Sequence, residues 1–585
     1  MSHGHGHGHG NPDDPERKIT YFATTHTRGK REMFGIRAVD RGKHMYVIGK
    51  TGMGKSTMLE NLAIQDIQNG NGIAFIDPHG SSAEKLLDFV PRERIKDVLY
   101  FAPFDVDYPV GFNVMEDVGY DKRHLVVSGL MGAFKRIWVD MWSARMEYIL
   151  QNVLLALLEY PETTLLDVNR MLTSKPFRSS VVDAVTDPVV KAFWAEEFAS
   201  YTDRYTQEAT PAIQNKVGQF VSNPLIRNIV GQPKSSFNLR EMMDTKKIFI
   251  VNLSKGRMGE SNAALLGSML TVKIYLAAMS RADEPPARMA KLPRCYFYVD
   301  EFQSMMNEAF ADILSESRKY KLALTLANQY IEQMEENVRN AVFGNVGSLI
   351  TFRVGPFDAE VLKVIFEPTF APEDLVNLGL GQIYLTLMID GVGSTPFSAD
   401  TIPPIEQPHI SYRDDVIRST REQYGRTRAD VEKIIGKRQA EFASPPVKPK
   451  EQRRDDRPRP DRPREPQRDT MPAPLPPRPE HPASREQQMP PRQREDRPMQ
   501  HRDRSEERHQ QAPRDAKNAL RDAILSAKNA GATGGAPADV LRSRMQSVVD
   551  KKPEVHPEKE PARAHAEKPR DEISPDDLRK ILNGS

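Results

Sequence analysis

The residues Gly49–Ser56 have the types and spacing of a phosphate-binding loop, in the order Gly-Lys-Thr-Gly-Met-Gly-Lys-Ser. Glycines let backbone N–H groups turn inward on an anion, and the first turn of a following helix adds partial positive charge. The apolar run HMYVI precedes the loop and a helical pattern over Thr57–Gln68 follows it, which is the context this motif requires. Lys55 is expected to reach the outer phosphates, and Ser56 to present its hydroxyl to a metal ion. The residues expected to contact the ligand are Gly49, Thr51, Gly52, Met53, Gly54, Lys55, Ser56 and Thr57.

Two acidic residues end another apolar run, Cys295–Glu301. A phosphate loop needs a carboxylate for the metal and a group that activates water, normally at the tip of a second buried strand. Asp300 is expected to hold Mg²⁺ through water, and Glu301 to polarise the attacking water. The two motifs together predict a site that binds ATP with Mg²⁺ and hydrolyses it.

Four residues are candidates for contact with the nucleotide, two within the chain and two in trans. Asn328 and Gln329 follow the next apolar run, where Gln329 is the better candidate for sensing this phosphate and a polar turn is the alternative. Arg318 precedes the apolar run Leu322–Ala327, and Arg353 ends the next apolar run, Gly347–Arg353. Either arginine is a candidate to act in trans on a neighbouring subunit, with Arg318 preferred, and such a residue accelerates hydrolysis by about 10³ to 10⁵. Surface solvation is the competing interpretation for both.

Two further segments have roles that the residues leave open. Asp77–Gly80 ends an apolar run, where ligand crevices open in parallel sheets, and is either a structural turn or a place where His79 contacts the nucleotide. The basic, glycine-bearing segment Asn252–Glu260 also follows an apolar run. It either meets DNA or a neighbouring subunit, or it is a flexible surface loop.

Apolar runs alternate with helical patterns from about Lys18 to Ile402, which predicts an α/β fold with a mostly parallel sheet covered on both faces. Between Glu116 and about Arg240 only helical patterns occur, so an all-α insertion is expected there. The expected strands are His44–Gly49, Gly72–Asp77, Asp97–Phe101, Lys247–Asn252, Cys295–Asp300, Leu322–Ala327, Gly347–Arg353 and Gln382–Met388.

The last quarter of the chain has few apolar residues. One charged amphipathic helix is predicted over Asp414–Phe442, and Pro, Arg, Glu and Gln then dominate in runs such as RPRPDRPREPQRD. Such a composition buries too little surface to fold, so a long disordered C-terminal tail is predicted. Three helix-like islands in the tail, Arg514–Asn529, Pro537–Asp550 and Ser574–Leu582, either dock on partners or form transient solvated helices.

Composition narrows the class of protein. The formal net charge is only +2, so any contact with nucleic acid depends on local placement of Lys and Arg. The single cysteine, Cys295, excludes an intramolecular disulfide and fits a reducing compartment. No stretch is judged to approach the roughly 20 apolar residues of a membrane span, so a soluble cytosolic chain is expected. The alternating His and Gly of Met1–Gly10 resemble a purification tag, in which case the native N-terminus is missing.

In their order and spacing, the motifs resemble those of the coupling ATPases of type IV secretion, the TraG/TraD kind, within the wider HerA and FtsK motor group. The likeness covers roughly Tyr46–Ile402. The matching segments are HMYVIGKTGMGKST, GIAFIDPHG, AIQNKVGQF, NIVGQPKSSFNLREMMD, IFIVNLSKGRMGE, CYFYVDEFQ and SRKYKLALTLANQY.

The resemblance implies a RecA-like P-loop motor with an all-α insertion that faces the cargo, assembled as a homohexamer that passes DNA through its centre. It implies DNA, a relaxase and other secretion-system proteins as partners. It also implies a cytoplasmic location at the inner face of the membrane, with membrane association through partners or through N-terminal helices that this sequence lacks. The family's site roles would fall on Lys55, Ser56, Asp300, Glu301, Gln329 and, in trans, Arg318.

Two other functions are alternatives to a secretion-linked DNA translocase. One is a HerA-like helicase that processes DNA ends, although the stretch before Met45 is short for the small barrel of such helicases. The other is an ATP-gated adaptor that recruits substrate without fast hydrolysis. The expected organisation is a tag-like stretch at 1–10, a first motor part at 18–115, the insertion at 116–240, a second motor part at 241–413, a C-terminal helix at 414–442 and the tail at 443–585.

Overall fold

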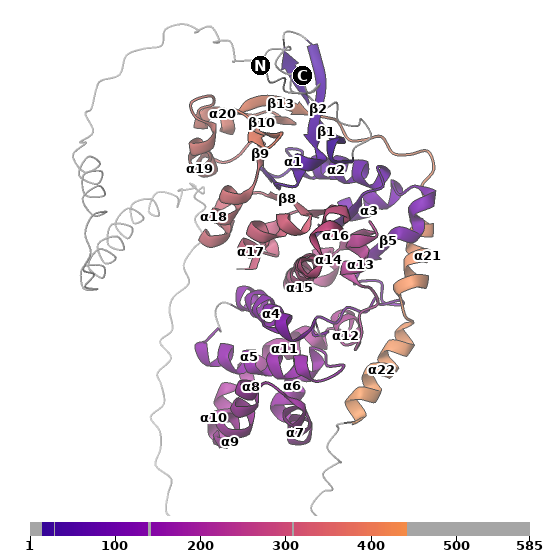
Figure 1. The fold of residues 1–585 in the computed structure, drawn as a ribbon, viewed down its shortest axis with the longest axis vertical. Helices are drawn as coiled ribbons and strands as arrows, with labels where there is room; N and C mark the ends of the chain where they lie inside the picture. The colour runs from indigo at the N-terminus through magenta and orange to yellow at the C-terminus, as the bar shows by residue number, and fades with distance from the viewer. Residues whose placement is uncertain (1–14, 28–29, 117, 139–141, 307–308, 442–585) are drawn as a thin grey trace, which may run out of the picture. The chain divides into compact units, whose positions relative to one another are not determined.

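Each of the eight expected apolar runs forms a strand of one 11-stranded sheet in the computed structural model of the chain (Figure 1). The structure describes residues 15–27, 30–116, 118–138, 142–306 and 309–441, so the predicted tail and the His-Gly stretch lie outside the described residues. Seven strands run parallel in the order β9-β3-β8-β7-β4-β6-β5. Their bounds are β3 Met45–Ile48, β4 Gly72–Asp77, β5 Val98–Phe101, β6 Ile248–Asn252, β7 Cys295–Val299, β8 Leu322–Asn328 and β9 Ser348–Thr351.

Four antiparallel strands extend the sheet beyond β9. β10 (Gln382–Thr386) pairs with β9, and β13 (Phe397–Thr401), β1 (Ile19–Thr27) and β2 (Lys30–Arg37) follow in that order. The sequence predicted neither β1 nor β2, because a threonine-rich run such as ITYFATTHT lacks the continuous apolar character of a central strand. A separate two-stranded ribbon joins β11 (Met388–Ile389) to β12 (Val392–Gly393). The prediction of a mostly parallel sheet is therefore confirmed, with an antiparallel edge added.

Helices cover both faces of the parallel part. Side chains alternate between two hydrophobic cores, so that Tyr46 and Ile48 of β3 face one core and Met45 and Val47 face the other. The second core is closed by α2 (Lys55–Gln68), α3 (Ser81–Asp88) and α21 (Arg413–Tyr424). The first is closed by α15 (Glu260–Met279), α17 (Ala309–Glu316), α18 (Glu336–Asn345) and α19 (Pro356–Phe366).

Only helices occur among the described residues between Gly119 and Thr245, in agreement with the helical pattern of this segment. The first of them, α4, packs against α15 at Gly129, where an added Cβ would lie 2.4 Å from Val272 Cγ1. A glycine therefore permits this close approach, and the segment shares one hydrophobic core with the sheet. Its α-helices are α4 Arg123–Ile137, α5 Ala144–Glu159, α6 Leu166–Thr173, α7 Lys175–Ala184, α8 Pro188–Ala192, α9 Phe198–Ser200, α10 Asp203–Ala209, α11 Pro211–Ser222, α12 Pro224–Val230 and α13 Leu239–Asp244.

The single helix predicted over Asp414–Phe442 is wrong, because two helices occupy this stretch. α21 ends at Tyr424 and α22 (Arg428–Glu441) begins after an extended break. In the break, Gly425 forms an isolated antiparallel bridge with Val110, and the N–H of Arg428 donates to the carbonyl of Asp107 at 3.0 Å. Pairing with this distant segment replaces the helical hydrogen bonds that local periodicity predicted. The remaining short helices are α1 Ala38–Arg41, α14 Lys255–Met258, α16 Pro286–Lys291 and α20 Pro372–Val376.

The expectation that no stretch has the length and apolar character of a membrane span is also wrong. Among the described residues, the helix over Glu260–Asp283 has both, with a mean hydropathy of 1.5 in its most apolar window. Within that window, 72% of the residues are buried inside the protein. The hydrophobic environment of this helix is therefore the core between the sheet and α4, and a buried core helix passes the same test as a membrane span.

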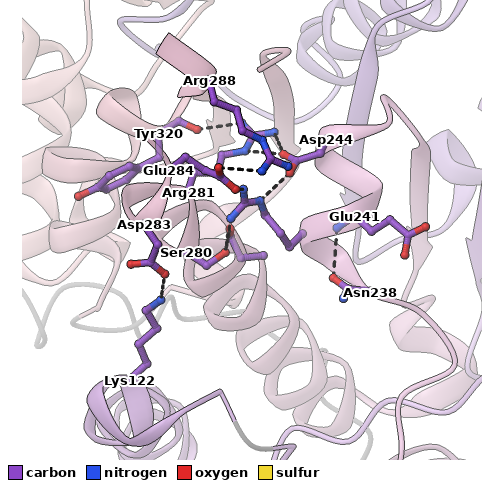
Figure 2. Close-up of polar contacts among 12 residues, drawn as sticks. Lys122, Asn238, Glu241, Asp244, Ser280, Arg281, Asp283, Glu284, Arg288 and Tyr320 are labelled. Atoms are coloured by element: carbon purple, nitrogen blue, oxygen red, sulfur yellow. Dashed lines mark hydrogen bonds and ion pairs between the residues drawn. The ribbon is translucent and has the colours of Figure 1, made fainter. Parts of the chain in front are cut away.

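Polar side chains join the helices at the amino edge of the sheet, the edge at which the parallel strands begin (Figure 2). Arg281, at the end of α15, is fully buried and donates to Asp244 Oδ1 at 2.9 Å and to the carbonyl of Tyr320 at 2.9 Å. Arg240 donates to Asp244 Oδ2 at 2.7 Å and to Glu284 Oε1 at 2.8 Å. These contacts fix α13, α15 and the turn before β8 to one another.

Candidate active site

The phosphate-binding pattern lies where the sequence placed it, between β3 and α2, at the carboxyl edge at which the parallel strands end. The N–H of Lys50 donates to the carbonyl of Arg353 at 2.8 Å, which ties the loop to the end of β9. Gly54 caps α2 with φ of 114°, a backbone conformation that favours glycine, and no side chain caps the helix. The first turn of α2 thus keeps backbone N–H groups available for an anion.

Lys55 is buried, and its side chain folds back on its own loop. Its Nζ donates to the carbonyl of Gly49 at 2.5 Å and to that of Lys50 at 3.1 Å. Burial lowers the pKa of this ammonium, and the nearby carboxylates of Asp300 and Glu301 oppose that shift. Because a phosphate oxygen is a stronger acceptor for a cation than a carbonyl, these partners are exchangeable for a ligand.

Ser56 and Asp300, the two predicted metal ligands, are in direct contact. Ser56 Oγ donates to Asp300 Oδ2 at 2.8 Å, although the residues are far apart in the chain. Burial raises the pKa of Asp300 to about 6, with the negative charges of Asp77 and Glu301 adding to it, while the Ser56 hydrogen bond and Lys55 act in the opposite direction. A hydroxyl and a buried carboxylate at the start of α2 form a donor set that suits Mg²⁺.

Glu301 lies at the centre of a group of side chains from four elements. Its backbone is left-handed, with φ of 47°, and its carboxylate accepts hydrogen bonds from Gln329 Nε2 and, at 3.2 Å, from Gln303 Nε2. Thr51 Oγ1 donates to Gln329 Oε1 at 2.9 Å. His79 Nε2 lies 3.6 Å from Glu301 Oε1. The phosphate loop, Gln329 and Glu301 are thereby linked in one polar chain.

Sequence reasoning left His79 undecided and missed Gln303. One signal could have identified His79 as a site residue. It follows β4, the neighbour of β7, so that it meets Glu301 at the carboxyl edge. Asp77 fixes the turn, because its carboxylate accepts from the N–H groups of His79 at 2.7 Å and Ala83 at 3.0 Å. Nothing in the local pattern distinguishes Gln303, which reaches Glu301 only through the turn at Phe302–Ser304.

Asn328 and Gln329 have different surroundings. Asn328 is fully buried, where its Oδ1 accepts from the Tyr46 hydroxyl at 2.5 Å and its Nδ2 donates to the carbonyl of Tyr330 at 3.0 Å. Gln329 instead faces Thr51 and Glu301. The structure thus places the preferred candidate in the site and its neighbour in the core.

Comparison with known proteins assigns a family to this arrangement. Residues 36–360, more than half of the chain, match the model of the type IV secretion-system coupling protein DNA-binding domain. The chain belongs to this family of coupling proteins. A search of curated proteins found no match.

Solved structures of the plasmid coupling protein TrwB and of VirB4 are similar to this coupling protein. Plasmid coupling protein TrwB in complex with ADP and Mg²⁺ is 16% identical, with 68% of this chain and 98% of that chain covered and a TM-score of 0.48. VirB4 of Thermoanaerobacter pseudethanolicus is 13% identical, with 65% and 96% covered and a TM-score of 0.45. The family assignment depends on the family model, which spans the phosphate loop, the helical segment and the acid pair.

The two candidate arginines of the coupling protein lie at opposite edges of the sheet. Arg318 precedes β8 and is exposed at the amino edge, away from the phosphate loop of its own chain. Arg353 follows β9 at the carboxyl edge, where its carbonyl accepts from Lys50 and its side chain is half-buried. The structure therefore brings Arg353 beside its own phosphate loop and leaves Arg318 exposed at the opposite edge.

The other expected loop residues differ in exposure. Met53 packs against the core beneath α2, and its carbonyl accepts from the N–H of Gly381 at 3.2 Å. Thr57 is half-buried in the first turn of α2, and Gly52 has φ of 79°. The loop is thus anchored at Met53 and open around Gly52, where nothing lies within 4 Å of an added Cβ.

The basic segment after β6 lies at the same edge but is largely helical. Lys255–Met258 forms α14, and the N–H of Lys255 donates to the carbonyl of Pro78 at 2.8 Å. Arg257 lies over the ring of Phe104, with its Cζ 4.4 Å from the ring centroid. The segment is therefore built onto the turn that carries His79, rather than being a free loop.

Proposed function

We propose that this coupling protein is an ATP-driven DNA translocase. The observation that carries the proposal is the cluster of side chains at the carboxyl edge, where Lys55, Ser56, Asp300 and Glu301 converge from two distant motifs. Cradling amides, a buried lysine, a metal donor pair and a carboxylate base are the parts that phosphoryl transfer from ATP to water requires.

The residues have separate roles in this proposal. Lys55 leaves the carbonyls of Gly49 and Lys50 and binds the β- and γ-phosphates. Ser56 and Asp300 would hold Mg²⁺, which would neutralise charge on the phosphates when bound. Glu301 accepts the proton of the attacking water.

Gln329 supports this step from the far side of the carboxylate. Its amide bridges Thr51 of the phosphate loop and Glu301. It is therefore placed to report the presence of a γ-phosphate to the base. Arg318 acts in trans, from the amino edge of one subunit toward the site of the next.

We propose ATP and Mg²⁺ as the ligands of this site; TrwB, to which the chain is similar, has been solved with ADP and Mg²⁺ and with non-hydrolysable GTP and ATP analogues. The family description names a DNA-binding domain, which supports DNA as the cargo. We further propose a homohexamer, a relaxase and other secretion-system proteins as partners, and a cytoplasmic location at the inner face of the membrane.

The helical segment at 116–240 is proposed as the part that contacts cargo, between motor parts at 18–115 and 241–413. It follows β5 and returns to the sheet at β6, so it is inserted between two strands that pair with each other. Movement of this segment is thereby mechanically linked to the sheet that carries the site.

The proposal is tested by ATP hydrolysis with and without single- and double-stranded DNA. Hydrolysis should rise with DNA and vanish in Lys55→Ala, whereas Glu301→Gln should lower it by about 10² to 10⁴ and still bind ATP. Glu373→Gln, the same change at an exposed glutamate on α20, is the matched control and should match the parent chain.

Three outcomes separate the alternatives. Robust hydrolysis that is indifferent to every form of DNA would remove the translocase proposal. Absence of hydrolysis in every oligomeric state would favour an ATP-gated adaptor. A HerA-like helicase would unwind DNA ends without any secretion partner. Such helicases place a small barrel before the motor, whereas here β1 and β2, the described strands before β3, belong to the main sheet.

A further inference from the structure

Two helices, α15 and α4, form hydrogen bonds to the turn that follows Glu301, the proposed base. Ser268 Oγ of α15 donates to the carbonyl of Met305 at 2.6 Å. Arg136, near the end of α4, donates through Nη2 to the carbonyl of Gln303 and forms an ion pair with Glu335 at 3.4 Å. Thus α15 holds the end of the turn, and α4 holds the residue that touches Glu301.

Gln303 joins α4 to the carboxylate in two steps. Its backbone carbonyl is held by Arg136, and its side-chain Nε2 donates to Glu301 Oε2 at 3.2 Å. The residue is 7% exposed, and its Oε1 is buried without a hydrogen-bond partner among the described residues. Because the hydrogen bond to Glu301 is the one contact that this buried amide makes through its nitrogen within the described part of the chain, a shift of the Gln303 backbone would move the amide and with it the carboxylate.

Arg136 is suited to transmit such a movement. The contact between a guanidinium and a carbonyl is a charge-assisted hydrogen bond, which is stronger than a neutral one. Burial lowers the pKa of Arg136, and Glu335 opposes that shift. Because α4 is the first helix of the segment proposed to contact cargo, its position is where cargo would act.

We propose that Arg136 is a positioning residue that couples α4 to the Glu301 carboxylate through Gln303. The inference rests on the nucleotide site proposed above and adds its regulation: displacement of α4 turns the base, and nucleotide at the base restrains α4. Reciprocity between two binding sites is a thermodynamic requirement, so the coupling is measurable from the nucleotide side alone.

Hydrogen–deuterium exchange of the full chain, with and without ADP and Mg²⁺, tests the coupling. Peptides from residues 49–68 report nucleotide binding, and peptides from residues 123–137 report α4. In the parent chain, nucleotide should slow exchange in both regions. In Arg136→Ala and in Gln303→Ala, nucleotide should still protect residues 49–68 but no longer residues 123–137.

Two further variants make the outcome specific. Glu335→Gln removes only the ion pair and should keep the response of α4. Arg136→Lys keeps the cation and the alkyl chain, so nucleotide should still protect residues 123–137, although less than in the parent chain. This variant replaces Arg136→Ala in the comparison if the alanine variant already loosens α4 before nucleotide is added. In hydrolysis assays, Arg136→Ala should lower kcat by about tenfold and change KM less than twofold, which loss of general stability would not do.

The results distinguish the inference from the proposal beneath it. Two results would overturn the coupling and leave the nucleotide site intact. In one, nucleotide protects α4 equally in the parent chain and in Arg136→Ala. In the other, nucleotide protects residues 49–68 of the parent chain but not α4. Absence of protection at residues 49–68 in the parent chain overturns both.

Discussion

Both edges of the parallel sheet carry charged groups, but the partners of these groups differ. At the amino edge, Arg41 makes a bidentate pair with Asp66, with both nitrogen–oxygen distances 2.9 Å and both side chains at most 1% exposed. Tyr298 donates its hydroxyl to the same carboxylate at 2.5 Å. At the carboxyl edge, Lys55 rests on two backbone carbonyls of its own loop and Ser56 on Asp300.

The difference lies in whether the partners are exchangeable. Arg281 and Asp244 at the amino edge are held by groups from three elements, so a ligand would have to break the fold to replace them (Figure 2). Around Lys55 the acceptors are carbonyls that a phosphate would replace at a gain. Polar groups with replaceable partners mark a site, whereas polar groups with irreplaceable partners mark a structural joint.

Arg318 gives the strongest test of this distinction between the edges, because it is an exposed cation at the amino edge, where the charged groups described above are structural. If it completes the site of a neighbouring subunit, Arg318→Ala should lower hydrolysis by about 10³ to 10⁵. Activity should return in part on mixing with Glu301→Gln subunits, which supply Arg318 to intact sites. Unchanged activity of Arg318→Ala would exclude the residue, and Arg353→Ala tests the other candidate in the same assay.

The buried pair at the amino edge should give the largest effect on stability. Asp66→Ala leaves Arg41 charged and buried, so the free energy of unfolding should fall by about 3–5 kcal/mol, measured by chemical denaturation. Ser56→Ala, which breaks an exchangeable contact, should cost less than about 1 kcal/mol. A loss of the same size for both variants would contradict the distinction between the edges.

The two edges should also respond to acid with opposite sign. Burial lowers the pKa of His44 at the amino edge to about 4, with Arg318 and Arg294 adding to the effect and a hydrogen bond to the backbone of Leu314 opposing it. Between pH 4 and about 6.5 the unfolded chain binds the proton and the folded chain does not, so this contribution to stability rises with pH. Asp300, with its pKa raised to about 6, keeps a proton in the folded chain that the unfolded chain loses, so its contribution falls as pH rises from about 4 to 6.

Differences between variants isolate these contributions. With EDTA present, the free energy of unfolding of the parent minus that of His44→Asn should increase by roughly 3 kcal/mol as the pH rises through the window given for His44. The free energy of unfolding of the parent minus that of Asp300→Asn should decrease by roughly 3 kcal/mol as the pH rises through the window given for Asp300. Asparagine is chosen at position 44 because the backbone there has φ of 66°. Slopes of the same sign would refute the assignment of these two groups.

The smallest expected effect concerns the link between the phosphate loop and Glu301, the proposed base. Thr51→Val removes the hydroxyl that donates to Gln329, and a hydrogen bond of about 1 kcal/mol corresponds to a loss of about fivefold in kcat. Thr173→Val, an exposed threonine on α6, is the matched control. A KM effect without a kcat effect would place Thr51 in nucleotide binding alone.

The central strands and the two main motifs could be predicted from sequence because their signals are local. An apolar run marks a buried parallel strand, and the order of Gly, Lys and Ser marks the loop that follows β3. Once parallel strands are assumed, their carboxyl ends must meet, which brings Asp300 to Ser56 without further information.

The missed features depend on partners far away in the chain. β1 is polar and becomes a strand because β2 and β13 lie beside it. The break at Gly425 exists because Val110 pairs there. Gln303 matters only because Arg136, which lies in the helical segment, holds its carbonyl. Periodicity reports what a segment does alone and carries no record of such pairings.

The apolar helix α15 has a consequence for how the protein is made. It packs on Gly129 through Val272, and around its own Gly267 it meets both Leu253, which the ribosome synthesises earlier, and Met305, which is synthesised later. A nascent chain that has just completed α15 therefore lacks the Met305 part of this packing until β7 and its turn emerge. During that interval the apolar helix on which the turn after Glu301 will rest is incompletely packed, a state in which exposed apolar surface favours association with other apolar surfaces.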